Sequence, residues 1–265
     1  MLNIKNYFKA STLEEAYELN QNKANVIVGG MLWLKMQDRN INTAIDLSGL
    51  GLDAIEENDT EFKIGAMVTL RQLETHTGLL MYTRGAVKEA VKHIVGVQFR
   101  NMATVGGSIF GRYGFSDVLT VFMAMDAVVK LYGAGEIPVK EFASMKYDRD
   151  VLEYIIVPKK NMQISYMSLR NSATDFPVLT CCSSCIDGTY ATVIGARPGR
   201  AECFTDDENI LTQGIDEDSA KAFGEYISDK VITESNNRAG AGYRRKIAGV
   251  LTKRTLLEIG GQGQS

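Results

Sequence analysis

Residues 103–109 read ATVGGSI and residues 28–34 read VGGMLWL, so that two adjacent glycines lie beside apolar residues in each stretch. Adjacent glycines allow consecutive backbone N–H groups to point into one concavity, and such a nest binds phosphate. Thr104 and Ser108 add hydroxyl groups at the rim of the second pair. One glycine pair alone is typical of a plain turn, whereas two pairs of this kind favour a cradle for a pyrophosphate.

Neither glycine pair belongs to a standard nucleotide-binding motif. The chain contains no G-x-G-x-x-G fingerprint and no G-x-x-x-x-G-K-[ST] loop. A Rossmann fold and a P-loop fold are therefore disfavoured.

The order of the predicted elements divides the chain into two parts. Residues 11–158 alternate short apolar strands with helices, which indicates an α/β arrangement, and Ser11 with Glu14 forms a capping box for the first helix. Residues 163–195 read as antiparallel strands joined by a hairpin turn at Asp187-Gly188, and two helices follow. We expect a first domain at 1–160, with an internal boundary near 55–60, and a second at 161–265 with a disordered tail from Gly260.

The composition indicates a globular protein of 265 residues, with 45% hydrophobic and 23% charged residues. A net charge of −3 argues against nucleic acid or an anionic membrane as the main partner. No apolar run reaches the roughly 18–20 residues that span a bilayer, and the N-terminus lacks the pattern of a signal peptide. We therefore expect a cytoplasmic protein.

Residues that often carry chemistry are few. Cys181, Cys182, Cys185 and Cys203 are enough in number for a metal or an iron–sulfur cluster, but their strand context favours core packing. His76 is expected to be exposed or capping, and His93 lies on a helix face. The run 244–246, Arg-Arg-Lys, indicates either a solvated face or a contact with an acidic partner.

The segment 100–109, RNMATVGGSI, followed by Ser116 and Asp117, resembles the FAD-binding subunits of the molybdenum hydroxylases. That family includes xanthine dehydrogenase, nicotinate dehydrogenase and the medium subunit of carbon monoxide dehydrogenase. The VGG sequence at 28–30 and the segment 238–245 are also similar to family motifs. The resemblance extends over residues 4–257.

The resemblance implies an α+β fold: a two-part FAD-binding domain of the vanillyl-alcohol oxidase type, then a smaller α+β domain of the carbon monoxide dehydrogenase flavoprotein type. In the family the two glycine loops hold the FAD pyrophosphate, an aspartate contacts the sugar-like part, and an apolar residue packs on the flavin. The residues that this implies are Ile27, Val28, Gly29, Gly30, Met31, Leu32, Trp33, Leu34, Ile94, Thr104, Val105, Gly106, Gly107, Ser108 and Asp117. No catalytic side chain and no metal ligand are expected.

The sequence departs from the family pattern at four places. Leu32 and Trp33 replace polar residues, and Ser108 replaces the usual Asn. The loop at 143–150 lacks the family's F-F-x-G-Y motif, and Met167 stands where some members have a Lys that contacts the flavin. The phosphate end of the site is thus retained, and the flavin-ring end is altered. Trp33 is expected either against a flavin or adenine ring or in the core or an interface.

By this resemblance, the chain is an oxidoreductase subunit that passes electrons from iron–sulfur clusters through FAD to NAD or another acceptor. The implied partners are a molybdopterin-binding large subunit and a [2Fe–2S] small subunit, in a complex duplicated about a two-fold axis. Two alternatives remain: an assembly subunit with little or no flavin, and a free-standing flavoprotein oxidoreductase.

Overall fold

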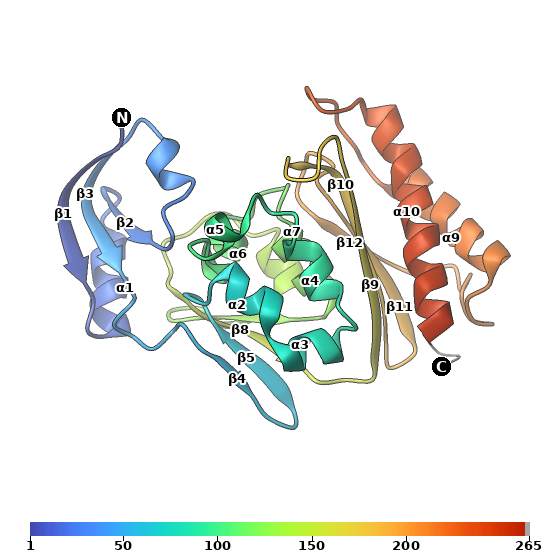
Figure 1. Cartoon of the computed structure of the whole chain (residues 1–265), viewed down its shortest axis with the longest axis horizontal. Helices are drawn as coiled ribbons and strands as arrows, with labels where there is room; N and C mark the ends of the chain where they lie inside the picture. The colour runs from blue at the N-terminus through green and yellow to red at the C-terminus, as the bar shows by residue number, and fades with distance from the viewer. Residues whose placement is uncertain (263–265) are drawn as a thin grey trace.

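The computed structural model describes residues 1–262. It contains three β-sheets, each with its own helices, which lie side by side (Figure 1). The first has three parallel strands in the order β1-β3-β2. Its elements are β1 (Asn3–Lys9), α1 (Leu13–Gln21), β2 (Asn25–Val28), η1 (Leu34–Met36) and β3 (Asn40–Asp46). Parallel strands need a crossover between them, and α1 supplies it from β1 to β2.

The central sheet is antiparallel, with strand order β4-β5-β8-β6-β7. Its strands are β4 (Ile55–Glu57), β5 (Glu61–Gly65), β6 (Val128–Leu131), β7 (Gly135–Pro138) and β8 (Leu152–Pro158). Its helices are α2 (Leu70–Thr75), α3 (Thr77–Tyr82), α4 (Ala86–Val91), α5 (Val97–Arg100), α6 (Val105–Phe110), α7 (Asp117–Ala124) and α8 (Val139–Phe142). Every residue of α7 is buried, as expected for a helix that is apolar on all sides and lies inside the core.

The third sheet, in the order β12-β11-β10-β9, separates two hydrophobic cores. Its elements are β9 (Met162–Arg170), β10 (Pro177–Ile186), β11 (Thr189–Gly195), β12 (Glu202–Thr205), α9 (Glu217–Lys230) and α10 (Ala241–Gln262). Helices α9 and α10 cover its outer face, and the central unit covers the other (Figure 1). Because side chains alternate along a strand, Cys182 packs in the central core and its neighbour Cys181 packs beneath α10.

The predicted hairpin at Asp187-Gly188 is confirmed, since both residues have the positive φ, 49° and 84°, of a tight hairpin turn. The central sheet ends at Pro158 and the third begins at Met162. We therefore propose to keep 1–160 and 161–265 as the domain limits, with a division inside the first near 55–60.

Two local predictions in the first domain are wrong. Thr12, not Ser11, caps α1: its hydroxyl accepts a hydrogen bond of 3.1 Å from Glu15 N, while Ser11 N donates to the Glu15 carboxylate. The apolar residues at 86, 87, 90, 91 and 94 predict a helix over 85–97, but α4 already ends at Val91. A few residues later Val95 has a φ of 50°, which a right-handed helix does not accommodate.

Two predictions at the C-terminal end are also wrong. Disorder is predicted from Gly260, but α10 continues to Gln262, and Gly260 packs closely on Ile215; residues 263–265 lie outside the described part. Arg244 is not on a solvated face. It is fully buried and donates to the carbonyl oxygens of Val178, Glu234 and Ala239, which satisfy its guanidinium.

Among residues 1–262, no helix is both long enough and apolar enough to cross a membrane.

Candidate cofactor-binding site

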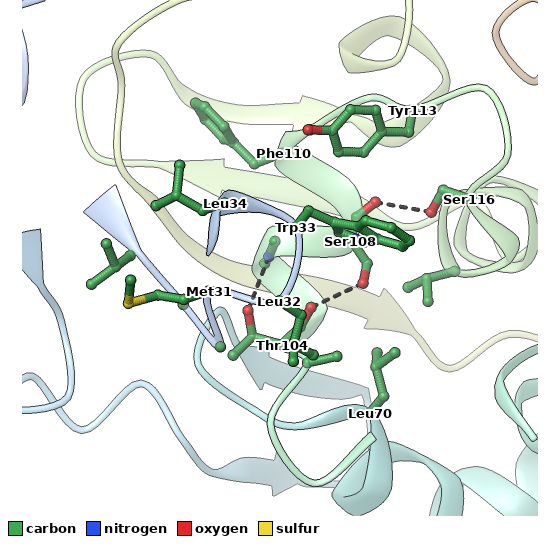
Figure 2. Close-up of a pocket in the computed structure, with 18 of the residues that line it drawn as sticks. Met31, Leu32, Trp33, Leu34, Leu70, Thr104, Ser108, Phe110, Tyr113 and Ser116 are labelled. Carbon is green, nitrogen blue, oxygen red and sulfur yellow. Dashed lines mark hydrogen bonds between the residues drawn. The ribbon is translucent and has the colours of Figure 1, made fainter. Parts of the chain in front are cut away.

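A cavity of about 630 Å³ lies where the three units meet. Figure 2 shows its central part, with the loop after β2 on one side and α6 on the other. All of the residues predicted for the site line this cavity except Val105, whose side chain is fully buried in the central core. The inclusion of Val105 is therefore wrong: on the first turn of α6 its side chain points toward the core and away from the cavity.

The two glycine loops touch each other at the floor of the cavity. A Cβ atom on Gly30 would lie 1.9 Å from the carbonyl oxygen of Met102, and one on Gly29 would lie 2.6 Å from the Thr104 hydroxyl. No larger residue fits at Gly30 unless the backbone moves. The first loop is thus positioned directly against the start of the second.

The second glycine pair is not an open phosphate nest. Residues 105–110 form the short helix α6, and the Thr104 hydroxyl is its N-cap. All four amides from 105 to 108 already have protein acceptors: Val105 N donates to Val68 O (2.8 Å), Gly106 N to Ala66 O (2.9 Å), Gly107 N to Thr104 Oγ1 (3.2 Å) and Ser108 N to Thr104 O (3.1 Å). In this structure these four amides are therefore engaged within the protein, and their binding of phosphate stays a prediction.

The first loop supplies the available donors. None of the backbone amides from Gly29 to Leu34 donates a hydrogen bond to another described residue. Met31 has a φ of 58°, in the left-handed region, where successive amides turn toward one side. This run of unpaired amides beside a cavity fits the oxygen atoms of a pyrophosphate.

Gly107 contributes space to the site. Gly106 needs its small size for packing, because a Cβ there would lie 2.6 Å from the Ala66 carbonyl oxygen. At Gly107 the nearest atom to an added Cβ is Thr104 Oγ1 at 3.1 Å, and the residue is exposed along the cavity wall. The contact of an added Cβ with Thr104 is tight but less severe than that at Gly106, and the exposed cavity wall at Gly107 leaves room for close approach of a ligand.

Asp117 forms a buried polar group with two residues of β9. The Tyr166 hydroxyl donates to Asp117 Oδ1 at 2.5 Å, and Arg170 forms an ion pair with the same oxygen. Burial raises the pKa of Asp117, and the charge of Arg170 opposes this shift; burial also raises the pKa of Tyr166 well above its usual range. Asp117 and Arg170 both line the cavity, so a carboxylate and a cation are held at fixed positions there.

Four aromatic rings at one side of the cavity were not predicted as a group. The Trp33 ring stacks on Phe176 with centroids 5.2 Å apart, and its edge contacts are with Phe99 and Phe115 at about 6 Å. Trp33 is 37% exposed, so it is a wall residue and not a core residue. These rings come from four separate segments, and no local pattern in the sequence relates them.

Met167 does not contact the cavity. It packs against the outer core beneath α10, whereas Tyr166 and Arg170 project from the opposite face of β9. The interpretation of Met167 as a flavin-ring position is therefore wrong. The alternation of side chains along the predicted strand could have shown this, because Arg170 shares its face with Tyr166 and not with Met167.

The cysteine and histidine side chains take part in packing, in helix capping or in the cavity wall. The Cys181 thiol lies 3.7 Å from the hydroxyls of Thr252 and Thr255, and burial raises its pKa to about 11. Nδ1 of His76 accepts from Leu79 N and so caps α3, as predicted, while His93 lines the cavity and burial lowers its pKa. Within residues 1–262, no group of three or more His, Cys, Asp or Glu side chains could hold a metal ion.

Comparison with known proteins identifies the family. Residues 2–160 match the model of the FAD binding domain in molybdopterin dehydrogenase. The uncharacterised protein YgfM of Escherichia coli is 25% identical, with 94% of this chain and 93% of that protein covered. The xanthine dehydrogenase FAD-binding subunit of Escherichia coli is 22% identical, with 97% of each chain covered.

The fold expected from the resemblance is confirmed by a solved structure. A chain of carbon monoxide dehydrogenase from Hydrogenophaga pseudoflava superimposes with a TM-score of 0.85 at 21% identity, and 97% of both chains is covered. The matched family model spans more than half of the chain and includes both glycine loops. The chain therefore belongs to the FAD-binding domain family of the molybdopterin dehydrogenases, the flavin-binding subunits of the molybdenum hydroxylases.

Proposed function

We propose that this chain binds FAD in the cavity between its three units and passes electrons from a partner's iron–sulfur cluster to NAD or another acceptor. The observation that supports it best is the run of unpaired amides at Gly29–Leu34, in a loop that lines the same cavity as Gly107. A flavin supplies the redox chemistry when it is bound. The protein positions the flavin and sets its electrostatic surroundings.

The residues that line the cavity suggest which part of FAD each of them contacts. The amides of the first loop take the pyrophosphate, and Asp117 takes hydroxyl groups of the sugar-like part. Ile94 and the rings of Trp33 and Phe176 offer apolar contact to a flat ring. Arg170 is paired with Asp117 in the same cavity, so the two side chains together add little net charge there.

The names of relatives support the partners that we propose. One relative is named as the FAD-binding subunit of xanthine dehydrogenase, and another as the medium chain of glyceraldehyde dehydrogenase in Sulfolobus acidocaldarius. We propose a complex of this chain with a molybdopterin-binding large subunit and a [2Fe–2S] small subunit, duplicated about a two-fold axis. The exposed surface of α10 near Arg245 and Lys246 is a candidate contact, whereas both faces of the C-terminal sheet are covered within the chain.

The first experiment is the visible absorption spectrum of the purified chain. We expect the two absorption bands of oxidised flavin and their bleaching by dithionite. A folded chain with no flavin, which also fails to take up added FAD, would contradict FAD binding.

The partner proposal needs purification from the native cell, followed by mass determination and metal analysis. We expect molybdenum and iron in the same peak as this chain. A flavin-containing monomer without either metal, and with full reductase activity, would instead favour a free-standing oxidoreductase.

An assembly subunit with little flavin is the second candidate, because Leu32 and Trp33 replace polar residues of the family pattern in the loop that lines the cavity. The spectrum also separates this candidate from the first. We propose a cytoplasmic location in either case, because four free thiols suit a reducing compartment; cell fractionation tests it.

A further inference from the structure

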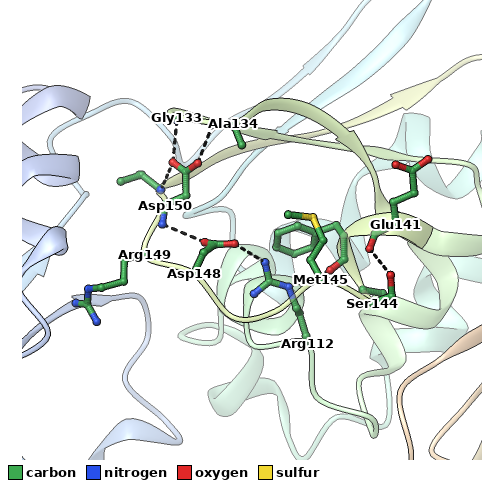
Figure 3. A network of polar contacts seen from close by, with 12 residues as sticks. Arg112, Gly133, Ala134, Glu141, Ser144, Met145, Asp148, Arg149 and Asp150 are labelled. Atoms are coloured by element: carbon green, nitrogen blue, oxygen red, sulfur yellow. Dashed lines mark hydrogen bonds and ion pairs between the residues drawn. The ribbon is translucent and has the colours of Figure 1, made fainter.

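Residues between α8 and β8 form an irregular segment whose backbone is fixed at two points (Figure 3). The Asp148 carboxylate accepts a hydrogen bond of 3.0 Å from Arg112 Nη2, and Arg112 is itself buried. The Asp150 carboxylate accepts from the amides of Gly133 and Ala134, both at 2.8 Å. The residue between these two anchors is Arg149.

Arg149 extends from this segment to the N-terminal unit. Its Nε donates to the carbonyl oxygen of Asn20, and its Nη2 donates to Asn22 O at 2.9 Å and Asn25 O at 2.7 Å. Asn20 returns a hydrogen bond of 2.7 Å to the carbonyl oxygen of Arg149. We call these hydrogen bonds the Arg149 bridge.

The carbonyl oxygens that accept the hydrogen bonds of the Arg149 bridge match the geometry of an arginine side chain. Its acceptors lie at the end of α1 and the start of β2, where a helix presents unpaired carbonyl oxygens and partial negative charge. The planar guanidinium can donate to several of these oxygens at once, which a lysine cannot do in the same geometry. Because both neighbours of Arg149 are anchored, its reach toward α1 is fixed.

The bridge lies on the cavity and next to the proposed phosphate donors. Asn20, Asn25 and Arg149 all line the cavity. Asn25 begins β2, and β2 leads directly into the loop of unpaired amides that starts at Gly29. The position of Asn25 therefore bears on where those amides lie relative to Gly107, which lines the same cavity on the other side of Thr104 Oγ1.

We propose that Arg149 is a positioning residue that holds the N-terminal unit closed over the cavity and so sets the affinity for a dinucleotide bound between the units. The part that concerns FAD rests on the proposed function. The closure itself is a property of the protein without ligand.

The test is Arg149→Ala, studied by hydrogen exchange without flavin and by titration with FAD. The variant should fold, because Ala10, Leu47 and Val151 still pack the N-terminal unit against β8. We expect faster amide exchange in residues 20–28 and an FAD affinity lower by about tenfold, a typical coupling between two sites. Arg149→Lys keeps the positive charge but cannot donate to the same three carbonyl oxygens. We therefore expect its affinity for FAD to be little higher than that of Arg149→Ala.

The matched control is Arg39→Ala. Arg39 lines the same cavity, is exposed, and donates from its side chain to no described residue. If Arg149→Ala and Arg39→Ala lower the affinity for FAD equally, and Arg149→Lys restores the wild-type affinity, only the positive charge matters and the proposal is overturned. Unchanged exchange in residues 20–28 of Arg149→Ala overturns it as well. A wild-type chain that binds no FAD would contradict the proposed function, while the exchange result would still decide whether the bridge holds the units together.

Discussion

The substitution Gly107→Ala should separate the stability of the fold from the binding of FAD. An added Cβ has one close neighbour, Thr104 Oγ1 at 3.1 Å. Gly107 lies within α6 and has no positive φ, so its backbone conformation does not require glycine. Alanine is preferred over glycine in helices by about 0.5–1 kcal/mol. For a chain of this size, that gain raises Tm by about 1–3 °C.

The same methyl group should weaken FAD binding. Gly107 lines the cavity together with the loop of Gly29–Leu34, so the methyl group takes up space beside that loop. Forcing one extra carbon into an occupied site costs about 1–3 kcal/mol, and each 1.4 kcal/mol is a factor of ten in Kd. We therefore expect Kd for FAD to rise by about 5- to 150-fold in a protein that is slightly more stable without ligand.

The assay is titration of the flavin-free chain with FAD, together with thermal unfolding of the same sample. The control is Gly242→Ala in α10, a helical glycine with no atom within 4 Å of an added Cβ and no part in the cavity. It should change Tm in the same direction and leave Kd unchanged. If Gly107→Ala keeps the wild-type Kd, the wall at Gly107 does not face the bound cofactor, and the placement of FAD proposed above is wrong.

Two further predictions concern the cofactor and the anchoring of the second loop. Heating should release FAD and not FMN, because the run of unpaired amides is long enough for two phosphates; FMN on the chromatogram would refute this. Burial raises the pKa of Glu74, but the hydrogen bonds from Arg100 and Arg71 outweigh it and hold that pKa below its usual 4.5. Stability from this carboxylate is therefore present above about pH 4.5 and lost as the pH falls through the lowered value. Glu74→Gln should lower the free energy of unfolding at pH 7 by about 3–5 kcal/mol, because Arg100 stays buried without its partner. On acidification, the Tm of Glu74→Gln should then fall less than the Tm of the wild type. If Tm depends on pH equally in both proteins, the Glu74 carboxylate does not contribute this stability.

The general location of the site could be predicted from the sequence, because glycine pairs at the ends of a strand and the start of a helix mark places where two backbones approach. The same pattern did not show which pair offers free amides. Both pairs look alike in the sequence, but Thr104 caps a helix that uses its own amides. A threonine three residues before Gly107 is a helix start signal, and it could have distinguished the two loops.

Contacts between residues far apart in the sequence could not be predicted, because sequence patterns describe only neighbouring residues. Arg244 belongs to a basic run, and its burial depends on the distant carbonyl oxygen of Val178 in β10 as well as on those of Glu234 and Ala239 just before α10. The aromatic wall around Trp33 likewise unites residues far apart in the sequence. Strand β1 was missed for a different reason. It is an edge strand with mostly exposed side chains, so it lacks the apolar alternation that indicates a strand.

The departures from the family pattern at Leu32 and Trp33 do not remove the proposed phosphate donors, because these donors are backbone amides and depend on the path of the chain. That path turns at Met31, where φ is 58°. A left-handed conformation costs a non-glycine residue about 1–2 kcal/mol, and a β-branched side chain tolerates it least. We therefore expect Met31→Gly to keep FAD binding and Met31→Val to weaken it at least tenfold, by rotating the amides that follow. The measurement is FAD titration of both variants, with circular dichroism as the check on folding. Equal affinities in two folded variants would mean that the loop does not hold the phosphates through its backbone, and that side chains elsewhere in the cavity do so.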